Sequence, residues 1–141
     1  MLPPLPLPER IGPYEVEAEI GRGATGVVLR ARDPRLDRPV AIKAIAEAVL
    51  HHEELHERFL REARTLAELD HPNVATVYGV EREGGRDYLV MELVDGESLL
   101  ERLARGTLDI DEALELCARM ADGLEAAHER GVVHRDFKPG N

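Results

Sequence analysis

Apolar and polar residues alternate with a period of two in several short stretches of the first two thirds of the chain. A period of two is typical of a half-buried strand, because successive side chains point to opposite faces of a sheet. Turn-forming residues separate the stretches, with two prolines in 33–39 and two glycines in 83–86. We therefore predict a five-stranded, mainly antiparallel sheet, with strands at residues 14–20, 27–32, 40–45, 74–80 and 88–92.

The period becomes helical between the third and fourth predicted strands. Over residues 53–68 and the turn that follows, apolar side chains recur at spacings of four, seven and three residues, at Leu55, Phe59, Leu66 and Leu69. This pattern predicts one long helix inserted into the sheet. A mainly antiparallel sheet with an inserted helix predicts an α+β fold.

Two further helices are expected in the last third of the chain. Ser98 can cap a short helix that ends near residue 104. Either Asp109 or Asp111 can cap a longer helix that runs to about Arg130, where Gly131 stops it.

The longer helix carries its own apolar stripe. Its members recur every three or four residues: Ile110, Leu114, Cys117, Ala121, Leu124 and His128. We expect Cys117 to lie on a core face as a small hydrophobic residue rather than as a nucleophile.

Composition and charge narrow the class of protein. The 141 residues are 43% hydrophobic and carry a formal net charge of -10, without a basic cluster to offset it, which argues against a nucleic-acid surface. The single cysteine excludes an internal disulfide and a zinc cluster of cysteines, and favours a reducing, cytoplasmic setting. No apolar run is long enough to span a membrane, and the start of the chain has no signal-peptide pattern.

The chain divides by composition into three parts. Residues 1–11 begin with alternating leucine and proline and are expected to form an extended lead-in. Residues 12–94 hold the predicted sheet and its inserted helix, and residues 95–141 hold the two later helices.

A glycine pattern joins the first two predicted strands. Gly21, Gly23 and Gly26 stand at a spacing that lets a backbone approach a phosphate closely. Dinucleotide-binding folds use a similar pattern, but there a helix follows the glycines. Here an apolar, β-branched stretch follows, which predicts a hairpin lying over a ligand. A flexible hairpin without a ligand is the plainer alternative.

Two charged residues stand where apolar ones are expected. Strand alternation places Lys43 on the same face as the small Ala41, which suits a ligand pocket, although most lysines face solvent. Glu62 falls inside the apolar stripe of the first long helix, and a carboxylate on a buried face needs a partner. Lys43 is the nearest candidate; the alternative places Glu62 at the edge of the stripe, facing water.

The last ten residues hold a second group of polar side chains, in the order His-Arg-Asp-x-Lys-Pro-x-Asn. Phosphoryl transfer needs a carboxylate that orients the attacking hydroxyl and accepts its proton, and Asp136 fits this role. Lys138 supplies a cation near the transferring phosphate, and the amide oxygen of Asn141 can bind a metal ion. The order of glycine loop, Val-Ala-Ile-Lys strand and this loop makes a chance match in another fold improbable.

With these motifs, residues 12–141 resemble the front half of a eukaryotic-type serine/threonine protein kinase, most closely the bacterial members. The stretches 33–43 and 131–141 are typical of that group. The resemblance implies a kinase fold whose sheet lobe is followed by the first helices of an incomplete helical lobe. It implies ATP and Mg²⁺ as cofactors, protein serine or threonine hydroxyls as substrate, and no nucleic-acid partner.

The same resemblance assigns a role to each site residue. Gly21, Gly23 and Gly26 would cover the ATP phosphates, while Lys43 would hold them and pair with Glu62 in the active state. The expected contacts to adenine are Ile20, Val28, Ala41, the gatekeeper position Met91, and the hinge residues Glu92 and Val94. Asp136 and Lys138 would be catalytic, and Asn141 would bind the metal.

One departure from the family pattern concerns the metal site. No Asp-Phe-Gly stands in these 141 residues, so a second metal-binding carboxylate is missing from them. We expect residues 1–141 alone to have little kinase activity, and the helix at 111–130 to expose an apolar face. The alternatives are a non-catalytic module that binds nucleotide or a partner, and a phosphotransferase that acts on small molecules.

Overall fold

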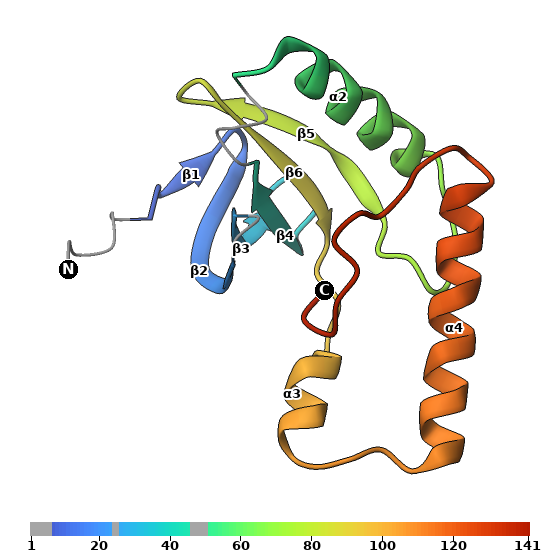
Figure 1. The fold of residues 1–141 in the computed structure, drawn as a ribbon. Coiled ribbons are helices and arrows are strands. Elements are labelled where there is room, and N and C mark those ends of the chain that lie inside the picture. Colours follow the sequence, from blue (N-terminus) through green and yellow to red (C-terminus); the bar gives the residue numbers. More distant parts are fainter. Residues whose placement is uncertain (1–6, 24–25, 46–50) are drawn as a thin grey trace.

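The computed structural model describes residues 7–23, 26–45 and 51–141. Most of the proline-rich start and residues 24–25 of the glycine pattern lie outside these ranges. The described strands form one antiparallel sheet in the order β1-β2-β3-β4-β6-β5 (Figure 1). Their bounds are β1 Arg10–Ile11, β2 Tyr14–Gly23, β3 Gly26–Asp33, β4 Arg38–Ala44, β5 Val77–Glu83 and β6 Arg86–Glu92.

The five predicted strands are confirmed, although most of their ends differ from the predicted ones by a few residues. The fourth begins at Val77 rather than at residue 74, because a turn bond from Val74 N to His71 O holds the chain in a loop. Thr76 then joins the end of β6, where the backbone N–H of Glu92 donates to its carbonyl at 2.8 Å.

A sixth strand, β1, was not predicted. It has two residues, Arg10 and Ile11, and pairs with β2 through Ile11 opposite Tyr14. Ile11 is fully buried in the core of the sheet, although we had placed residues 1–11 in the lead-in. Two residues are too few for alternation to reveal a strand.

The core lies on one face of the curved sheet. Leu29, Ile42 and Val90 face one another across β3, β4 and β6, and each is at most 3% exposed. The alternation predicted for the third strand is confirmed, because Val40 and Ile42 are both fully buried on this core face. Ala41 and Lys43 therefore lie on the opposite face, where Ala41 is 6% exposed and Lys43 is half-buried.

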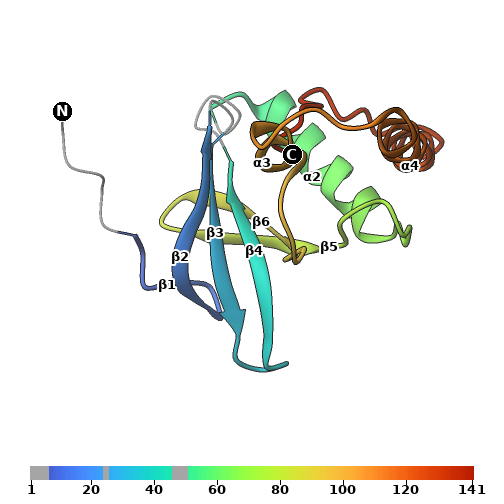
Figure 2. The ribbon, with the colours of Figure 1, turned by 90° about the horizontal axis from the view of Figure 1, so that it is seen from below.

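Three helices follow from the patterns described above. α2 spans Glu53–Ala67, which confirms the predicted inserted helix, and it packs against β5. α3 spans Leu99–Ala104, with Ser98 and Glu101 forming a reciprocal capping box. α4 spans Ile110–His128, and Asp109 is its N-cap, which settles the choice between the two aspartates. All three helices lie on one side of strands β2 to β4 (Figure 2).

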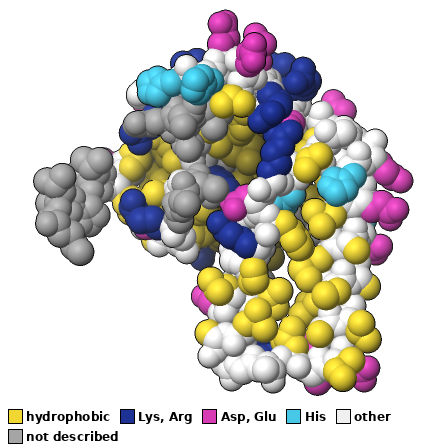
Figure 3. Space-filling model, in the orientation of Figure 1, with side chains coloured by type: hydrophobic (Ala, Val, Ile, Leu, Met, Phe, Trp, Pro, Cys, Tyr) yellow, Lys and Arg dark blue, Asp and Glu magenta, His cyan; other side chains and the backbone are white. Residues whose placement is uncertain are grey.

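The prediction for Cys117 is wrong, because its side chain is exposed rather than in a core. No element in the described part of the chain covers the N-terminal half of the apolar stripe of α4, where Ile110 is 78% exposed and Leu114 is 64% exposed. The expected exposed apolar face is thus confirmed. Figure 3 shows hydrophobic side chains gathered along the facing sides of α3 and α4. No helix in the described part of the chain is both long and apolar enough to cross a membrane.

Candidate active site

The glycine pattern forms the tip of the hairpin between β2 and β3. The register pairs Gly21 with Val28 and Gly23 with Gly26. Gly26 has φ of 129°, and a Cβ built on it would lie 2.5 Å from the carbonyl oxygen of Ala44 in β4. Only glycine avoids this clash, so the third glycine has a structural reason in the sheet itself.

The hairpin places an apolar residue at the surface beside the glycines. The register slips between Glu19 and Gly21, which leaves Ile20 as the extra residue of a bulge. Ile20 is 49% exposed, which is unusual for a strand isoleucine. An exposed apolar side chain at this point suits the predicted contact with adenine.

The residues predicted to contact adenine and phosphate share one face of the sheet. Val28 lies opposite Lys43, and Ala41 lies opposite Met91, in neighbouring rows of that face. The row between them, which holds Ile42, faces the core on the other side. The sheet therefore gathers these four predicted residues on the side away from the core.

The two predicted hinge residues follow directly at the end of β6. Glu92 is tied to the loop before β5, since its Oε2 accepts from the backbone N–H of Thr76 at 3.1 Å. Val94 lies beyond the strand and is 65% exposed. The segment that joins the sheet to α3 thus begins at Glu92, which a hydrogen bond holds in place, and continues through the exposed Val94.

Lys43 and Glu62 do not form an ion pair in this structure. Lys43 is half-buried and has no ion-pair partner in the described ranges of the chain. Glu62, on α2, instead meets Arg135, whose Nη1 lies 3.3 Å from Glu62 Oε1. Arg58 Nε approaches the same oxygen at 3.9 Å. The expectation that Glu62 has a cationic partner is correct, while its pairing with Lys43 remains a prediction for the active state.

The loop after α4 brings the three predicted catalytic and metal residues together. Lys138 Nζ lies 3.2 Å from Asp136 Oδ2. The Asn141 amide Nδ2 donates to the same carboxylate oxygen at 3.0 Å and to the Asp136 carbonyl at 2.7 Å. Its amide nitrogen is thus turned toward Asp136, while the predicted role of the amide oxygen as a metal ligand remains a prediction. A carboxylate, an ammonium group and an amide oxygen thus share one small turn.

Backbone contacts fix this loop in place. The N–H of Asp136 donates to His134 O at 2.8 Å, and Arg135 between them adopts a positive φ of 60°. The first turn of α3 holds the other end of the loop, because Leu100 N donates to Pro139 O at 2.8 Å. A loop held at both ends can position a carboxylate for chemistry.

The charges at the rim of the glycine hairpin are also paired. Arg22, between two of the glycines, donates from Nε to Glu19 Oε1 at 2.8 Å. This hydrogen bond lowers the pKa of the Glu19 carboxyl below its ordinary value. The Arg22 side chain is 57% exposed and that of Glu19 is 30% exposed, so solvent weakens the pair and its contribution to stability is small.

Two contacts that position the loop were not foreseen from the sequence. A Cβ added to Gly123 of α4 would lie 2.7 Å from the carbonyl oxygen of Asn73, so α4 docks closely on the loop before β5. Arg130 Nη1 also donates to Glu68 O at the end of α2, at 2.9 Å. Both contacts join residues far apart in sequence, and only the isolated Gly123 inside a helical pattern could have signalled one.

Fold and site together define a class of protein. A glycine hairpin lies at the edge of a sheet face that carries a half-buried lysine, and a separate loop carries an aspartate, a lysine and an asparagine. These are the parts with which an enzyme holds a nucleotide and transfers its terminal phosphate.

Comparison with known proteins agrees with this class. Residues 14–141 match the protein kinase domain family. The serine/threonine-protein kinase PknA of Mycobacterium tuberculosis is 44% identical over 92% of this chain and 32% of its own length. A probable serine/threonine-protein kinase, pknA2, of Bifidobacterium longum is 41% identical over 92% of this chain and 18% of its own length.

The solved structures agree as well. The crystal structure of the Mycobacterium tuberculosis PknI kinase domain matches with a TM-score of 0.83 and 30% identity, over 94% of this chain and 54% of that one. The chain therefore belongs to the serine/threonine protein kinase family, in its bacterial branch. It spans about a fifth to a third of these curated relatives, and about half of the solved kinase domain.

Proposed function

We propose that the protein carrying this sequence transfers the terminal phosphate of ATP to serine or threonine hydroxyls of proteins. The observation that carries the proposal is the catalytic loop, in which Lys138 and Asn141 both contact the carboxylate of Asp136. The carboxylate would orient the attacking hydroxyl and accept its proton. Lys138 would offset the charge that develops on the transferred group.

The sheet would supply the nucleotide site. Lys43 faces away from the core and has no competing carboxylate among the described residues, so its ammonium group is available to ATP phosphates. Val28 and Ala41 would pack against the adenine, with Met91 behind them.

Asn141 fits a magnesium ion, because hard divalent cations prefer oxygen ligands and its amide nitrogen is already turned toward Asp136. Asn141 would hold such an ion, whose positive charge would offset that of the ATP phosphates. Residues 1–141 supply one such ligand at this loop, so we propose that these residues expressed by themselves transfer phosphate poorly.

The test compares Asp136→Asn with the matched change Asp122→Asn on the exposed surface of α4. Transfer from radiolabelled ATP to a protein substrate is measured in the full-length protein carrying this sequence. We expect Asp136→Asn to lower kcat by about 10²–10⁴-fold while ATP still binds, and Asp122→Asn to leave kcat unchanged.

The outcomes separate the alternatives. ATP binding without transfer in the unmodified protein would favour a non-catalytic nucleotide-binding module. Transfer to a small-molecule hydroxyl, and not to protein, would favour the small-molecule phosphotransferase. Robust autophosphorylation by residues 1–141 alone, abolished by Lys43→Met, would overturn the proposal that this stretch is inactive by itself.

A further inference from the structure

The part of the catalytic loop that carries Lys138 and Asn141 contacts the first turn of α3. The backbone N–H of Leu100 donates to Pro139 O at 2.8 Å. The Leu100 side chain reaches the following residue as well, since a Cβ built on Gly140 would lie 3.6 Å from Leu100 Cδ2. Pro139 and Gly140 stand between the two predicted functional side chains, so this turn of α3 supports the loop at the point that joins them.

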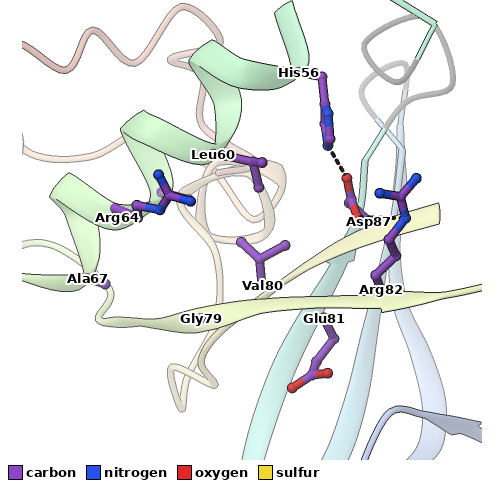
Figure 4. Close-up of a pocket in the computed structure, with 10 residues that line it drawn as sticks. His56, Leu60, Arg64, Ala67, Gly79, Val80, Glu81, Arg82 and Asp87 are labelled. Carbon is purple, nitrogen blue, oxygen red and sulfur yellow. Dashed lines mark hydrogen bonds and ion pairs between the residues drawn. The ribbon is translucent and has the colours of Figure 1, made fainter. Parts of the chain in front are cut away.

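The beginning of the loop has a support of its own. Arg135 Nη1 lies 3.3 Å from Glu62 Oε1 on α2. α2 is fixed to the sheet in turn, because His56 Nε2 bonds to Asp87 Oδ2 of β6 at the wall of a pocket between α2 and β5 (Figure 4). The two ends of the loop are therefore held through different helices, and a change in α3 can be studied apart from α2.

A reciprocal capping box orders the first turn of α3. The Glu101 N–H donates to Ser98 Oγ at 3.2 Å, and the Glu101 carboxylate accepts from the Ser98 N–H at 2.7 Å. Hydrogen bonds from the backbone and the side chain of Ser98 lower the pKa of the Glu101 carboxyl, so it is ionised and able to accept at neutral pH. Leu100 lies between the two capping residues, and the box therefore fixes the direction of the N–H that Pro139 accepts.

Few other contacts that the structure describes order this turn. α3 has six residues, none of which is buried by the described ranges of the chain. A helix so short is marginal without tertiary packing. Its second turn is tied to α4, because Arg102 Nη2 lies 2.9 Å from Glu112 Oε2. Loss of the cap should therefore fray the first turn and leave the second in place.

The predicted nucleotide residues are anchored separately from α3. β6 ends at Glu92, whose N–H donates to Thr76 O at 2.8 Å and whose carboxylate accepts from the Thr76 N–H at 3.1 Å. Residues 93–97 then lead to Ser98. A change at Ser98 should thus reach the catalytic loop without moving the sheet face that would hold ATP.

We propose that Ser98 is a positioning residue for phosphate transfer, which acts through Leu100 on the part of the loop that carries Lys138 and Asn141. This role deepens the proposed function and rests on it for the activity measurements. The Ser98 hydroxyl touches neither ATP nor the acceptor protein and works through the backbone at Pro139. Its loss should therefore change kcat rather than the KM for ATP.

The first test compares Ser98→Ala with Ser98→Thr in the full-length protein carrying this sequence, with casein as the acceptor protein. We expect Ser98→Ala to lower kcat about 3–10-fold, because an N-cap shifts the balance between an ordered and a frayed turn by about 2–30-fold. The KM for ATP should change by less than about twofold. Ser98→Thr keeps the hydroxyl and should restore kcat to within about twofold of the unmodified protein.

Ala118→Gly is the control for lost stability alone. Ala118 is exposed on α4, and glycine there weakens the helix by an amount similar to a lost cap. Ser98→Ala and Ala118→Gly should therefore lower the melting temperature in circular dichroism by similar amounts. Only Ser98→Ala should lower kcat.

A second measurement does not depend on activity. Amide hydrogen exchange reports how often local backbone hydrogen bonds open. Within the loop, the N–H groups of Asp136 and Asn141 donate to His134 O and Lys138 O. We expect Ser98→Ala to speed exchange about 3–10-fold in residues 98–104 and 134–141, and to leave β6 unchanged.

Several results would overturn the proposal. One is a kcat of Ser98→Ala within about twofold of the unmodified protein. Another is an equal loss of kcat in Ser98→Thr or in Ala118→Gly, because the hydroxyl or the first turn of α3 would then not be the cause. Unchanged exchange in residues 134–141 would show that α3 does not hold the loop, whether or not the protein transfers phosphate. If exchange responds but the unmodified protein transfers no phosphate, the proposed function fails while the link between α3 and the loop stands.

Discussion

Replacing Gly26 by alanine tests whether the glycine hairpin is shaped by the sheet or only by its ligand. The added Cβ would lie 2.5 Å from the carbonyl oxygen of Ala44, and the residue has φ of 129°, where side chains are strained. Gly21 is the matched control in the same hairpin. Its φ is not positive, and a Cβ there would meet only Val28, at an ordinary 3.7 Å.

The two substitutions should differ clearly in the free energy of unfolding. An L side chain in the glycine-only backbone region costs about 1–3 kcal/mol. Displacing the backbone oxygen of a paired strand adds about 1–3 kcal/mol of overpacking strain. Because one small movement relieves part of both, we expect Gly26→Ala to lose about 2–4 kcal/mol. Gly21→Ala should be neutral or stabilise by up to about 1 kcal/mol, since glycine weakens a strand.

Urea unfolding of each variant without nucleotide measures this difference, and nucleotide affinity is measured separately. A Gly26→Ala variant within about 0.5 kcal/mol of the unmodified chain would refute the reasoning, because it would mean that Ala44 moves aside freely. If both variants keep full stability but lose nucleotide affinity, the glycines serve the ligand alone.

Three further predictions concern the contacts around the loop and the sheet. Gly123→Ala should lower the free energy of unfolding, measured in urea, by about 1–3 kcal/mol, because its Cβ would press on a backbone oxygen at 2.7 Å. This loss should outweigh the better helix propensity of alanine. Ala118→Gly, at an exposed position of the same helix, measures the effect of helix propensity alone. A double-mutant cycle of Arg135→Gln with Glu62→Gln should give a coupling of about 0.5–1 kcal/mol, and zero coupling would show that the contact stabilises nothing. Burial opposes ionisation of Asp33, but hydrogen bonds from Arg35 outweigh this effect and lower the pKa of its carboxyl from the ordinary 3.8. The contribution of Asp33 to stability should therefore be complete above pH 3.8 and be lost as the pH falls through the lower pKa of the folded state. Asp33→Asn should make the stability less dependent on pH in this acidic range.

The sequence predicted those parts of the fold that depend on neighbouring residues. Alternation identified five strands, Ser98 marked the start of α3, and the start of α4 was narrowed to Asp109 or Asp111, of which Asp109 is the cap. Alternation also placed Ala41 and Lys43 on one face. Each of these inferences needs only a few consecutive side chains and the geometry of one element.

The predictions that were wrong concern burial, which depends on what an element packs against. Cys117 belongs to a true apolar stripe, yet a stripe becomes a core face only when another element covers it, and no described element does. The prediction for Ile11 was wrong in the opposite sense, because this residue was placed in the lead-in and is buried. It packs in the core beside β2, although its neighbours in sequence show no strand pattern. Burial is a property of two surfaces, and one stretch of sequence describes only one of them.

Glu62 shows where the boundary between the two kinds of inference lies. Its place within an apolar helical stripe required a cationic partner, and the structure provides one with the Glu62 side chain 24% exposed. That need is local, and the sequence indicated it while leaving open a position of Glu62 that faces water. The choice between Lys43 and Arg135 depends on how the loop after α4 returns to α2, which Gly123, Arg130 and the α3 contact at Pro139 decide together. An ion pair is therefore predictable as a requirement before it is predictable as a contact.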